Sequence, residues 1–314
     1  MKKKLQILLK IIKKPRSALI VFIRSPRISK CIPDKLYLRI LFRLILGRKL
    51  DLKEPSTLNE KLQWMKLYDH RDEYVVMVDK YAVREYIRER IGEKYLVPLI
   101  AVWDNPSEIN FSILPNKFVL KCNHNSGYGM CICKDKSQID TKKVCDELRQ
   151  GLARDYYSFS REWPYSKVKR RIICEKLLEY KDTSKSIEDY KFMCFNGKVD
   201  NVFICEGRYS NRGVRYHYFD RDWNYLPYCP YDDVDPDTFS LPKPENYEEM
   251  ITVAEKLSQG YPALRIDLYN IDGKIYFGEI TLFTQSGFDT TITHEADVLM
   301  GNKFIIPHKK SCDT

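Results

Sequence analysis

Residues 264–281 alternate apolar and polar side chains in two runs that an Asp-Gly pair separates. Side chains two apart in a strand point to the same face of a sheet, so this pattern predicts a β-hairpin with one apolar face. The other face carries Arg265, Asp267, Glu279 and Thr281. Two acids, an arginine and a threonine are therefore expected side by side in the folded protein.

The length of the loop decides which of these side chains face one another. A two-residue Asp-Gly turn would place Ile266 opposite Glu279, which puts a carboxylate on the apolar face. A three-residue loop over residues 271–273, with its glycine left-handed at a bulge, instead pairs Arg265 with Glu279 and sets Asp267 diagonally beside them. We therefore predict the three-residue loop.

The polar face of this hairpin is a candidate metal site. Carboxylate and hydroxyl oxygens suit Mg²⁺, which takes a few carboxylates and completes its octahedron with phosphate oxygens and water. The candidate ligands are Asp267, Glu279 and Thr281. The alternative is an ordinary solvated hairpin with a cross-strand pair between arginine and glutamate.

The composition indicates a globular protein with reduced thiols. A chain of 314 residues with 44% hydrophobic content can form a real core and two or three subdomains. The ten cysteines are irregularly spaced and no secretory signal is recognisable, so we expect a cytoplasmic protein with buried thiols. Structural zinc is disfavoured, because Cys131 and Cys133 have the wrong spacing for a zinc knuckle.

The positive charge of the chain is concentrated near its start. The formal net charge is +10, and residues 1–50 hold nine lysines and six arginines against the single acid Asp34. The longest apolar run, residues 18–23, is too short to span a bilayer. We expect residues 1–32 to form a basic amphipathic segment on the anionic inner face of a membrane, with a basic helix packed on the protein body as the alternative. No nucleic-acid partner is expected, because aromatic stacking platforms do not accompany these charges.

The next part of the chain predicts packed helices. Residues 33–113 are expected to form a helical and mixed subdomain, with helices over 36–46, 57–68 and 75–91 and a strand over 95–102. The second of these helices begins with a capping sequence of threonine followed by glutamate three residues later. A second module is expected to begin near residue 114.

That module opens with a candidate phosphate-binding loop. A strand over residues 117–122 contains Lys121 near its end and leads into a glycine-bearing loop, which is followed by a returning strand over 131–133. Glycines permit the positive φ and close approach that let backbone N–H groups surround a phosphate. The candidate residues are Lys121, Asn125, Ser126, Gly127, Tyr128 and Gly129. A plain hairpin is the alternative.

A third signal follows the phosphate loop. Residues 171–178 predict an apolar strand that ends in Glu175, Lys176 and Leu177. Further on, Asp189 and Lys191 lie two apart on one strand face, where they could contact a ribose and a phosphate. A same-face surface salt pair is the commoner meaning of that spacing.

In their order along the chain, these stretches resemble the TupA-like ATP-grasp proteins of bacterial surface-polysaccharide loci, a family often loosely labelled glycosyltransferase. The resemblance runs from about Pro33 to Pro307 and rests on residues 57–66, 79–84, 118–124, 173–176, 189–192 and 276–281. It implies an α+β ATP-grasp fold, in which two α+β subdomains with antiparallel sheets enclose the nucleotide after a helical N-terminal region. The ATP-grasp domain would cover residues 114–310, with lobes of about 114–178 and 179–310.

The resemblance also implies roles for individual residues. Lys121 and the loop over 125–130 would contact the nucleotide phosphates, and Lys191 would be a second phosphate contact. The adenine hinge would be Glu175, Lys176 and Leu177, with Asp189 near the ribose. Asp267 and Glu279 would bind Mg²⁺, while Arg265 would steady the reacting phosphoryl and acyl oxygens, so that Arg265 and Lys191 are the candidate catalytic residues. Thr281 stands where many such ligases have asparagine, which makes it a weaker ligand. Gln285, Ser286 and His294 would border the acceptor site.

The implied activity is ATP-dependent carboxylate–amine ligation through an acyl phosphate, with ATP and Mg²⁺ as cofactors. The expected substrates are an amino acid and a sugar acid or amino sugar of a lipid-linked glycan. The alternatives are a kinase, a glycosyltransferase or a non-catalytic ATP-grasp-like binding module. Asp220 and Asp222 are the best rival metal pair, because they have the Asp-x-Asp spacing expected of a glycosyltransferase.

Overall fold

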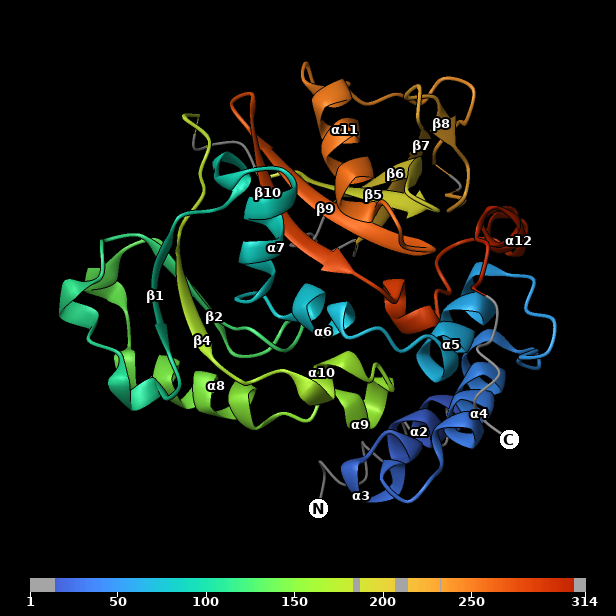
Figure 1. The fold of residues 1–314 in the computed structure, drawn as a ribbon, viewed down its shortest axis with the longest axis horizontal. Helices are drawn as coiled ribbons and strands as arrows, with labels where there is room; N and C mark the ends of the chain where they lie inside the picture. Colours follow the sequence, from blue (N-terminus) through green and yellow to red (C-terminus); the bar gives the residue numbers. More distant parts are fainter. Residues whose placement is uncertain (1–14, 183–186, 207–213, 232, 308–314) are drawn as a thin grey trace.

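The computed structural model describes residues 15–182, 187–206, 214–231 and 233–307. Two antiparallel sheets face one another across the molecule, and helices cover their outer sides (Figure 1). The four-stranded sheet has the order β1-β4-β2-β3 and the six-stranded sheet has the order β10-β9-β5-β6-β7-β8. This arrangement confirms the predicted α+β fold with two antiparallel sheets.

The strands of the first sheet are β1 (Leu99–Trp103), β2 (Phe118–Cys122), β3 (Met130–Cys133) and β4 (Ile172–Lys176). Those of the second are β5 (Asp189–Phe195), β6 (Lys198–Glu206), β7 (Arg215–Asp220), β8 (Tyr225–Leu226), β9 (Ala263–Ile271) and β10 (Lys274–Thr281). Strand β1 precedes residue 114 and pairs with β4, so the first sheet draws one edge strand from the N-terminal region of the chain.

The longer helices are α2 (Pro15–Ile23), α4 (Asp34–Leu46), α5 (Leu58–Tyr68), α7 (Val83–Arg90), α8 (Thr141–Ala153), α11 (Tyr247–Ser258) and α12 (His294–Lys303). Shorter helical segments are α3 (Pro26–Ser29), α6 (Glu73–Val78), α9 (Tyr157–Ser160) and α10 (Pro164–Lys167). The predicted helices over 36–46 and 57–68 are confirmed, and the Thr57 hydroxyl and Glu60 carboxylate form the capping box of α5. No helix in the described ranges is long and apolar enough to cross a membrane.

The predicted single helix over residues 75–91 is wrong. The chain forms two helices, α6 and α7, with Asp79 between them. The Asp79 carboxylate accepts hydrogen bonds from the backbone N–H groups of Tyr81 (2.8 Å) and Ala82 (3.2 Å) and from the Asn123 side chain (2.8 Å). A side chain that bonds the local backbone competes with helix continuation, and here it breaks the helix beside the loop that follows β2.

The predicted three-residue loop between β9 and β10 is also wrong. Asp272 and Gly273, both with positive φ, form a two-residue turn that places Ile271 opposite Lys274. A bulge at Gly278 then shifts the register by one residue, so that the polar side chains return to one face. As a result, Glu279 lies opposite Asp267, and Thr281 lies opposite Arg265. The shared polar face was predicted correctly, whereas the cross-strand pairs were not.

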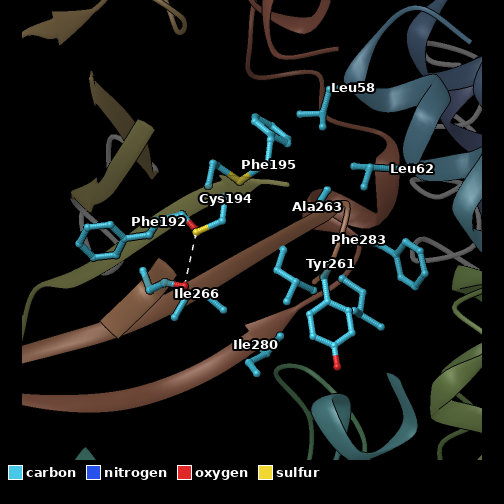
Figure 2. Close-up of a cluster of buried hydrophobic side chains, with 14 of the residues drawn as sticks. Leu58, Leu62, Phe192, Cys194, Phe195, Tyr261, Ala263, Ile266, Ile280 and Phe283 are labelled. Carbon is cyan, nitrogen blue, oxygen red and sulfur yellow. Dashed lines mark hydrogen bonds between the residues drawn. The ribbon is translucent and has the colours of Figure 1, made fainter. Parts of the chain in front are cut away.

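Two hydrophobic cores stabilise the lobes. The smaller core lies between the four-stranded sheet and α8, and the larger core lies beneath the six-stranded sheet and extends into the N-terminal helices. Figure 2 shows how β5, β9 and β10 contribute Phe192, Ile266 and Ile280 to the larger core, which Leu58 and Leu62 of α5 approach from the side. The N-terminal helices and the second sheet therefore share one continuous core.

Gly301 of α12 packs closely against the N-terminal end of α5. We predict that Gly301→Ala destabilises this packing. A Cβ atom at residue 301 would lie 2.7 Å from the Thr57 Cα atom and would also overlap the Ser56 carbonyl oxygen, so backbone would have to move. Overpacking of this kind costs about 2 kcal/mol. Urea unfolding should show this loss, and Asn302→Ala, at the exposed neighbouring position, should not. Wild-type stability of the Gly301 variant would contradict the packing described here.

Candidate nucleotide and metal site

A cavity of about 500 Å³ lies between the two sheets. Its walls come from β2, β3 and β4 on one side and from β5, β9 and β10 on the other, and Lys80, Val83 and Arg84 at and before the start of α7 also line it. Five of the predicted nucleotide-binding residues line it, namely Lys121, Glu175, Lys176, Leu177 and Asp189. The cavity has the size and the mixed apolar and polar lining that suit a nucleotide.

The lysine on β2 is held by an acid on the neighbouring strand. The Lys121 Nζ lies 2.6 Å from one Glu175 carboxylate oxygen, and the Arg84 guanidinium donates to the other at 3.1 Å. Antiparallel pairing of β2 with β4 places Val119 opposite Glu175, which sets Lys121 and the acid two residues apart on one face. Lys121 therefore has a fixed position at the cavity wall.

The glycine-bearing loop is fastened to the C-terminal end of α8. Gly129 has a positive φ, and a Cβ atom on it would lie 2.9 Å from the Gly151 Cα atom, so only glycine allows this close approach. The Asn125 side chain donates to the Gly151 carbonyl oxygen at 3.1 Å. The Arg154 guanidinium stacks on the exposed Tyr128 ring, 3.3 Å from its centroid. The loop is thus held at the end of β2, and the residues that line the cavity include Met130 of β3 but not the predicted loop residues 125–129.

Lys80 is a functional candidate that the sequence analysis missed. It lies just after Asp79 at the break between α6 and α7, and its Nζ donates to the Asn125 carbonyl oxygen at 2.8 Å. The same Nζ lies 3.9 Å from a Glu279 carboxylate oxygen. Lys80 therefore connects the loop of one lobe to the polar stripe of the other, which is the face of the second sheet that carries Lys191, Arg265, Asp267 and Glu279. Burial lowers its pKa, against the opposing effect of the Glu279 charge. Lys80 belongs to the stretch 79–84 on which the family resemblance partly rests. A continuous helix over 75–91 was predicted there, and such a helix gave no reason to expect Lys80 at the site.

The polar stripe of the second sheet is a connected network of charges. Asp267 is only 2% exposed, and its carboxylate binds both the Lys191 ammonium and the Arg265 guanidinium, the latter through two bonds of 2.7 and 2.9 Å. Arg265 also donates to Glu279 at 3.0 Å. Lys191 lies 2.6 Å from the carboxylate of Asp189. Strands β5, β9 and β10 are adjacent, so their registers bring these side chains together.

This network fixes the charge states of its members. Burial alone would raise the pKa of Asp267. The charges of Arg265 and Lys191 lower this pKa by more than burial raises it, so the net pKa lies below its usual value. Burial acts to lower the pKa of Arg265 and of Lys191, and the Asp267 carboxylate more than reverses this in both groups. All three side chains therefore stay ionised at neutral pH.

The stripe fits Mg²⁺ only together with phosphate. Within the described ranges, no group of three or more His, Cys, Asp or Glu side chains could hold a metal ion alone. Mg²⁺ is commonly held by one or two carboxylates and by substrate phosphates, and Asp267 and Glu279 supply that number. The Thr281 hydroxyl donates to Glu279 at 3.4 Å and so lies within the same group.

The residues predicted to border the acceptor site do not lie together, and the rival metal residue has a structural role. His294 contacts Arg48 near the C-terminal end of α4, whereas Ser286 lies in the turn that follows β10. The rival metal residue Asp220 instead caps a turn, because its carboxylate accepts from the backbone N–H groups of Asp222 (2.9 Å) and Asn224 (2.8 Å).

Two facing antiparallel sheets, with a nucleotide-sized cavity between them that lysines and acids line, are the features expected of an ATP-grasp protein. Residues 60–305 match the family model of the TupA-like ATP-grasp proteins, so this chain belongs to that family. No curated protein matches the chain.

Several solved structures are similar in fold. D-alanine–D-alanine ligase from Helicobacter pylori is 13% identical, with a TM-score of 0.42, and the match covers 79% of this chain and 69% of the ligase. The Bacillus anthracis enzyme of the same name, complexed with ATP, is 14% identical with a TM-score of 0.40, covering 77% and 65%. N5-carboxyaminoimidazole synthetase from Staphylococcus aureus is 12% identical with a TM-score of 0.40, covering 74% and 53%.

We predict that Lys80→Met weakens ATP binding about tenfold, the loss expected when one charge-assisted contact of about 1.4 kcal/mol is removed. Methionine keeps the length and apolar stem of the side chain but cannot pair with a phosphate. Isothermal titration with a non-hydrolysable ATP analogue would measure the change. Lys143→Met, at an exposed position on α8, is the matched control. Equal affinity of the Lys80 variant and wild type would remove Lys80 from the site.

Proposed function

We propose that this protein is an ATP-dependent carboxylate–amine ligase. The observation that carries the proposal is the network of Lys191, Asp267, Arg265 and Glu279 beside the cavity. Its Glu279 carboxylate lies 3.9 Å from the Lys80 Nζ, and Lys80 and Lys121 both line the cavity. Cations from both sheets suit the phosphate chain of ATP, and the two acids suit Mg²⁺. Membership of the ATP-grasp family supports the same chemistry.

In the proposed reaction, a substrate carboxylate oxygen attacks the γ-phosphorus of ATP, which gives an acyl phosphate and ADP. An amine then attacks the acyl carbon, and inorganic phosphate leaves as the amide forms. Lys80, Lys121 and Lys191 would neutralise phosphate oxygens, and Arg265 would steady the oxygens of the reacting groups. Mg²⁺ bound to Asp267 and Glu279 would withdraw charge from the phosphates.

No covalent intermediate on the protein is needed in this scheme. Two buried thiols within the first sheet, Cys122 of β2 and Cys174 of β4, are unsuited to act as nucleophiles. Burial raises the pKa of Cys122 to about 11 and that of Cys174 to about 12. Catalysis would therefore depend on the positions of charges and on exclusion of water.

The proposal for the substrates is based on the resemblance to proteins of surface-polysaccharide loci. We propose that the enzyme joins an amino acid to a sugar acid or amino sugar of a lipid-linked glycan in the assembly of a bacterial surface polysaccharide. A kinase or glycosyltransferase of such a locus is the alternative function. A glycosyltransferase differs from the ligase in the nucleotide it requires, since it binds a nucleotide sugar, whereas a kinase uses ATP but needs no amine substrate.

We predict that Mg²⁺ strengthens binding of a non-hydrolysable ATP analogue to the wild type, and that Glu279→Gln removes most of that gain. Glutamine keeps the shape of the side chain but not the charge that binds the metal. Titrations with and without Mg²⁺ would measure the difference, and Glu295→Gln, an exposed acid on α12, is the control. Stronger stabilisation by UDP-glucose than by the ATP analogue would contradict the ligase proposal.

We also propose that the α2 surface docks on an anionic membrane. On α2, Leu19, Val21 and Phe22 are 45%, 71% and 58% exposed, and basic residues flank them in the sequence. Arg16 donates to the Arg43 carbonyl oxygen at 3.0 Å, which fastens α2 to α4. Exposed apolar side chains beside lysine and arginine suit the interface of an anionic bilayer. Residues 1–14 of the predicted membrane segment lie outside the described part of the chain.

We predict that the double variant Val21→Asp, Phe22→Asp releases the protein from vesicles with 30% phosphatidylglycerol, because it replaces apolar contact with like-charge repulsion. Co-sedimentation would measure binding, and pure phosphatidylcholine vesicles would test the electrostatic part. Ile113→Asp, another exposed apolar position at 72%, is the control. Unchanged sedimentation of the double variant would count against a membrane surface on α2.

A further inference from the structure

The turn that follows β10 has an unusual backbone. Gln285 (φ 46°, ψ 27°) and Ser286 (φ 55°, ψ 28°) are both left-handed, and Gly287 follows with φ 63°. Two successive non-glycine residues rarely adopt this region, because the Cβ atom crowds the backbone. Such a conformation persists only where the surrounding structure enforces it.

Buried polar groups enforce this turn. The Lys66 ammonium donates to the Ser286 carbonyl oxygen (2.8 Å) and to its hydroxyl oxygen (3.1 Å), and that hydroxyl donates to the Glu162 carboxylate (2.7 Å). Gln63 donates to the Ser286 carbonyl oxygen at 3.1 Å. Lys66 and Glu162 are only 3% and 4% exposed. Two buried polar side chains, joined through the Ser286 hydroxyl, therefore hold the turn in one shape.

The result is a closed ring of contacts beside the polar stripe. Arg265 donates to the Thr284 hydroxyl (3.2 Å), and its guanidinium carbon lies 5.9 Å from the centroid of the Phe203 ring. The Phe203 ring packs edge-on against Tyr216 at 5.8 Å, and the Gln285 side-chain amide donates to the Tyr216 hydroxyl at 3.2 Å. The exposed Gln285 side chain and the half-buried Tyr216 side chain thus meet next to Arg265.

The groups that this ring offers to a ligand are an amide, a phenol hydroxyl and an aromatic ring. An amide both donates and accepts hydrogen bonds, as a sugar hydroxyl does, and neither Gln285 nor Tyr216 can neutralise a charge. The ammonium or carboxylate of a free amino acid would therefore gain little from this pair. A neutral, hydroxyl-bearing part of a ligand fits it better.

We propose that Gln285 and Tyr216 bind hydroxyl groups of a sugar in the acceptor substrate and set specificity for it, whereas Lys66 and Glu162 are positioning residues that hold the turn. This inference rests on the proposed ligase function, since Arg265 is the group that would join the sugar subsite to the reacting atoms.

The test uses Gln285→Gly in the full chain. Glycine adopts the left-handed backbone readily, so the variant should keep or raise the melting temperature while it loses the amide. Saturation-transfer NMR with glucuronate and with glucosamine, in the presence of Mg²⁺ and a non-hydrolysable ATP analogue, would measure sugar affinity. We expect at least a roughly tenfold loss in Gln285→Gly and in Tyr216→Leu, with unchanged nucleotide affinity. Gln138→Ala, at the exposed end of the short 3-10 helix Lys136–Gln138, should behave as the wild type.

Two outcomes would overturn the sugar subsite: a wild type that binds the nucleotide but neither sugar, or a Gln285→Gly variant that binds sugar as the wild type does. Failure of the proposed function would look different, because the wild type would then not bind the ATP analogue. In that case the same comparison of sugar affinities without nucleotide would decide the subsite.

Discussion

The ion network around Asp267 is the constraint on which the site depends. A carboxylate that is 2% exposed would cost several kcal/mol if it lacked a partner, so its burial requires the two cations that bind it. Arg265 lies two residues from Asp267 on β9, whereas Lys191 comes from β5 and meets the acid only when β5 and β9 pair in the observed register. The electrostatics of the site and the alignment of the sheet therefore enforce one another.

The polar stripe of the second sheet is connected to the loop after β2 at the break between α6 and α7. The Asp79 side chain bonds the backbone N–H groups of Tyr81 and Ala82 and the side chain of Asn123 at the base of that loop. Lys80 then extends between that loop and Glu279. The break between α6 and α7 thus positions one lysine to contact both the loop after β2 and the second sheet.

Much of this site could be predicted from the sequence, because period-two patterns identify strand faces whatever the loop length. Asp267, Glu279 and Arg265 were placed on one face in this way, and the structure has them there. The loop itself was predicted wrongly, since the bulge at Gly278 corrects the register within the strand. A glycine in a strand is a weak signal for a bulge, and the apolar pattern was equally consistent with a longer turn. Lys80 was missed because charged residues before and after it suit a continuous helix.

Local sequence patterns were enough to predict the glycine-bearing loop beside Lys121 and the polar face of the β9–β10 hairpin, whereas the two-sheet α+β class came from the resemblance to a family. The two local features depend on neighbours within one or two strands, where alternation and turn chemistry act. The contact of Lys80 with Glu279, and the shaping of the turn beside Arg265 by Lys66 and Glu162, became visible only in the folded protein. These contacts join residues far apart in the chain, and their stability comes from shared burial, which no local pattern encodes.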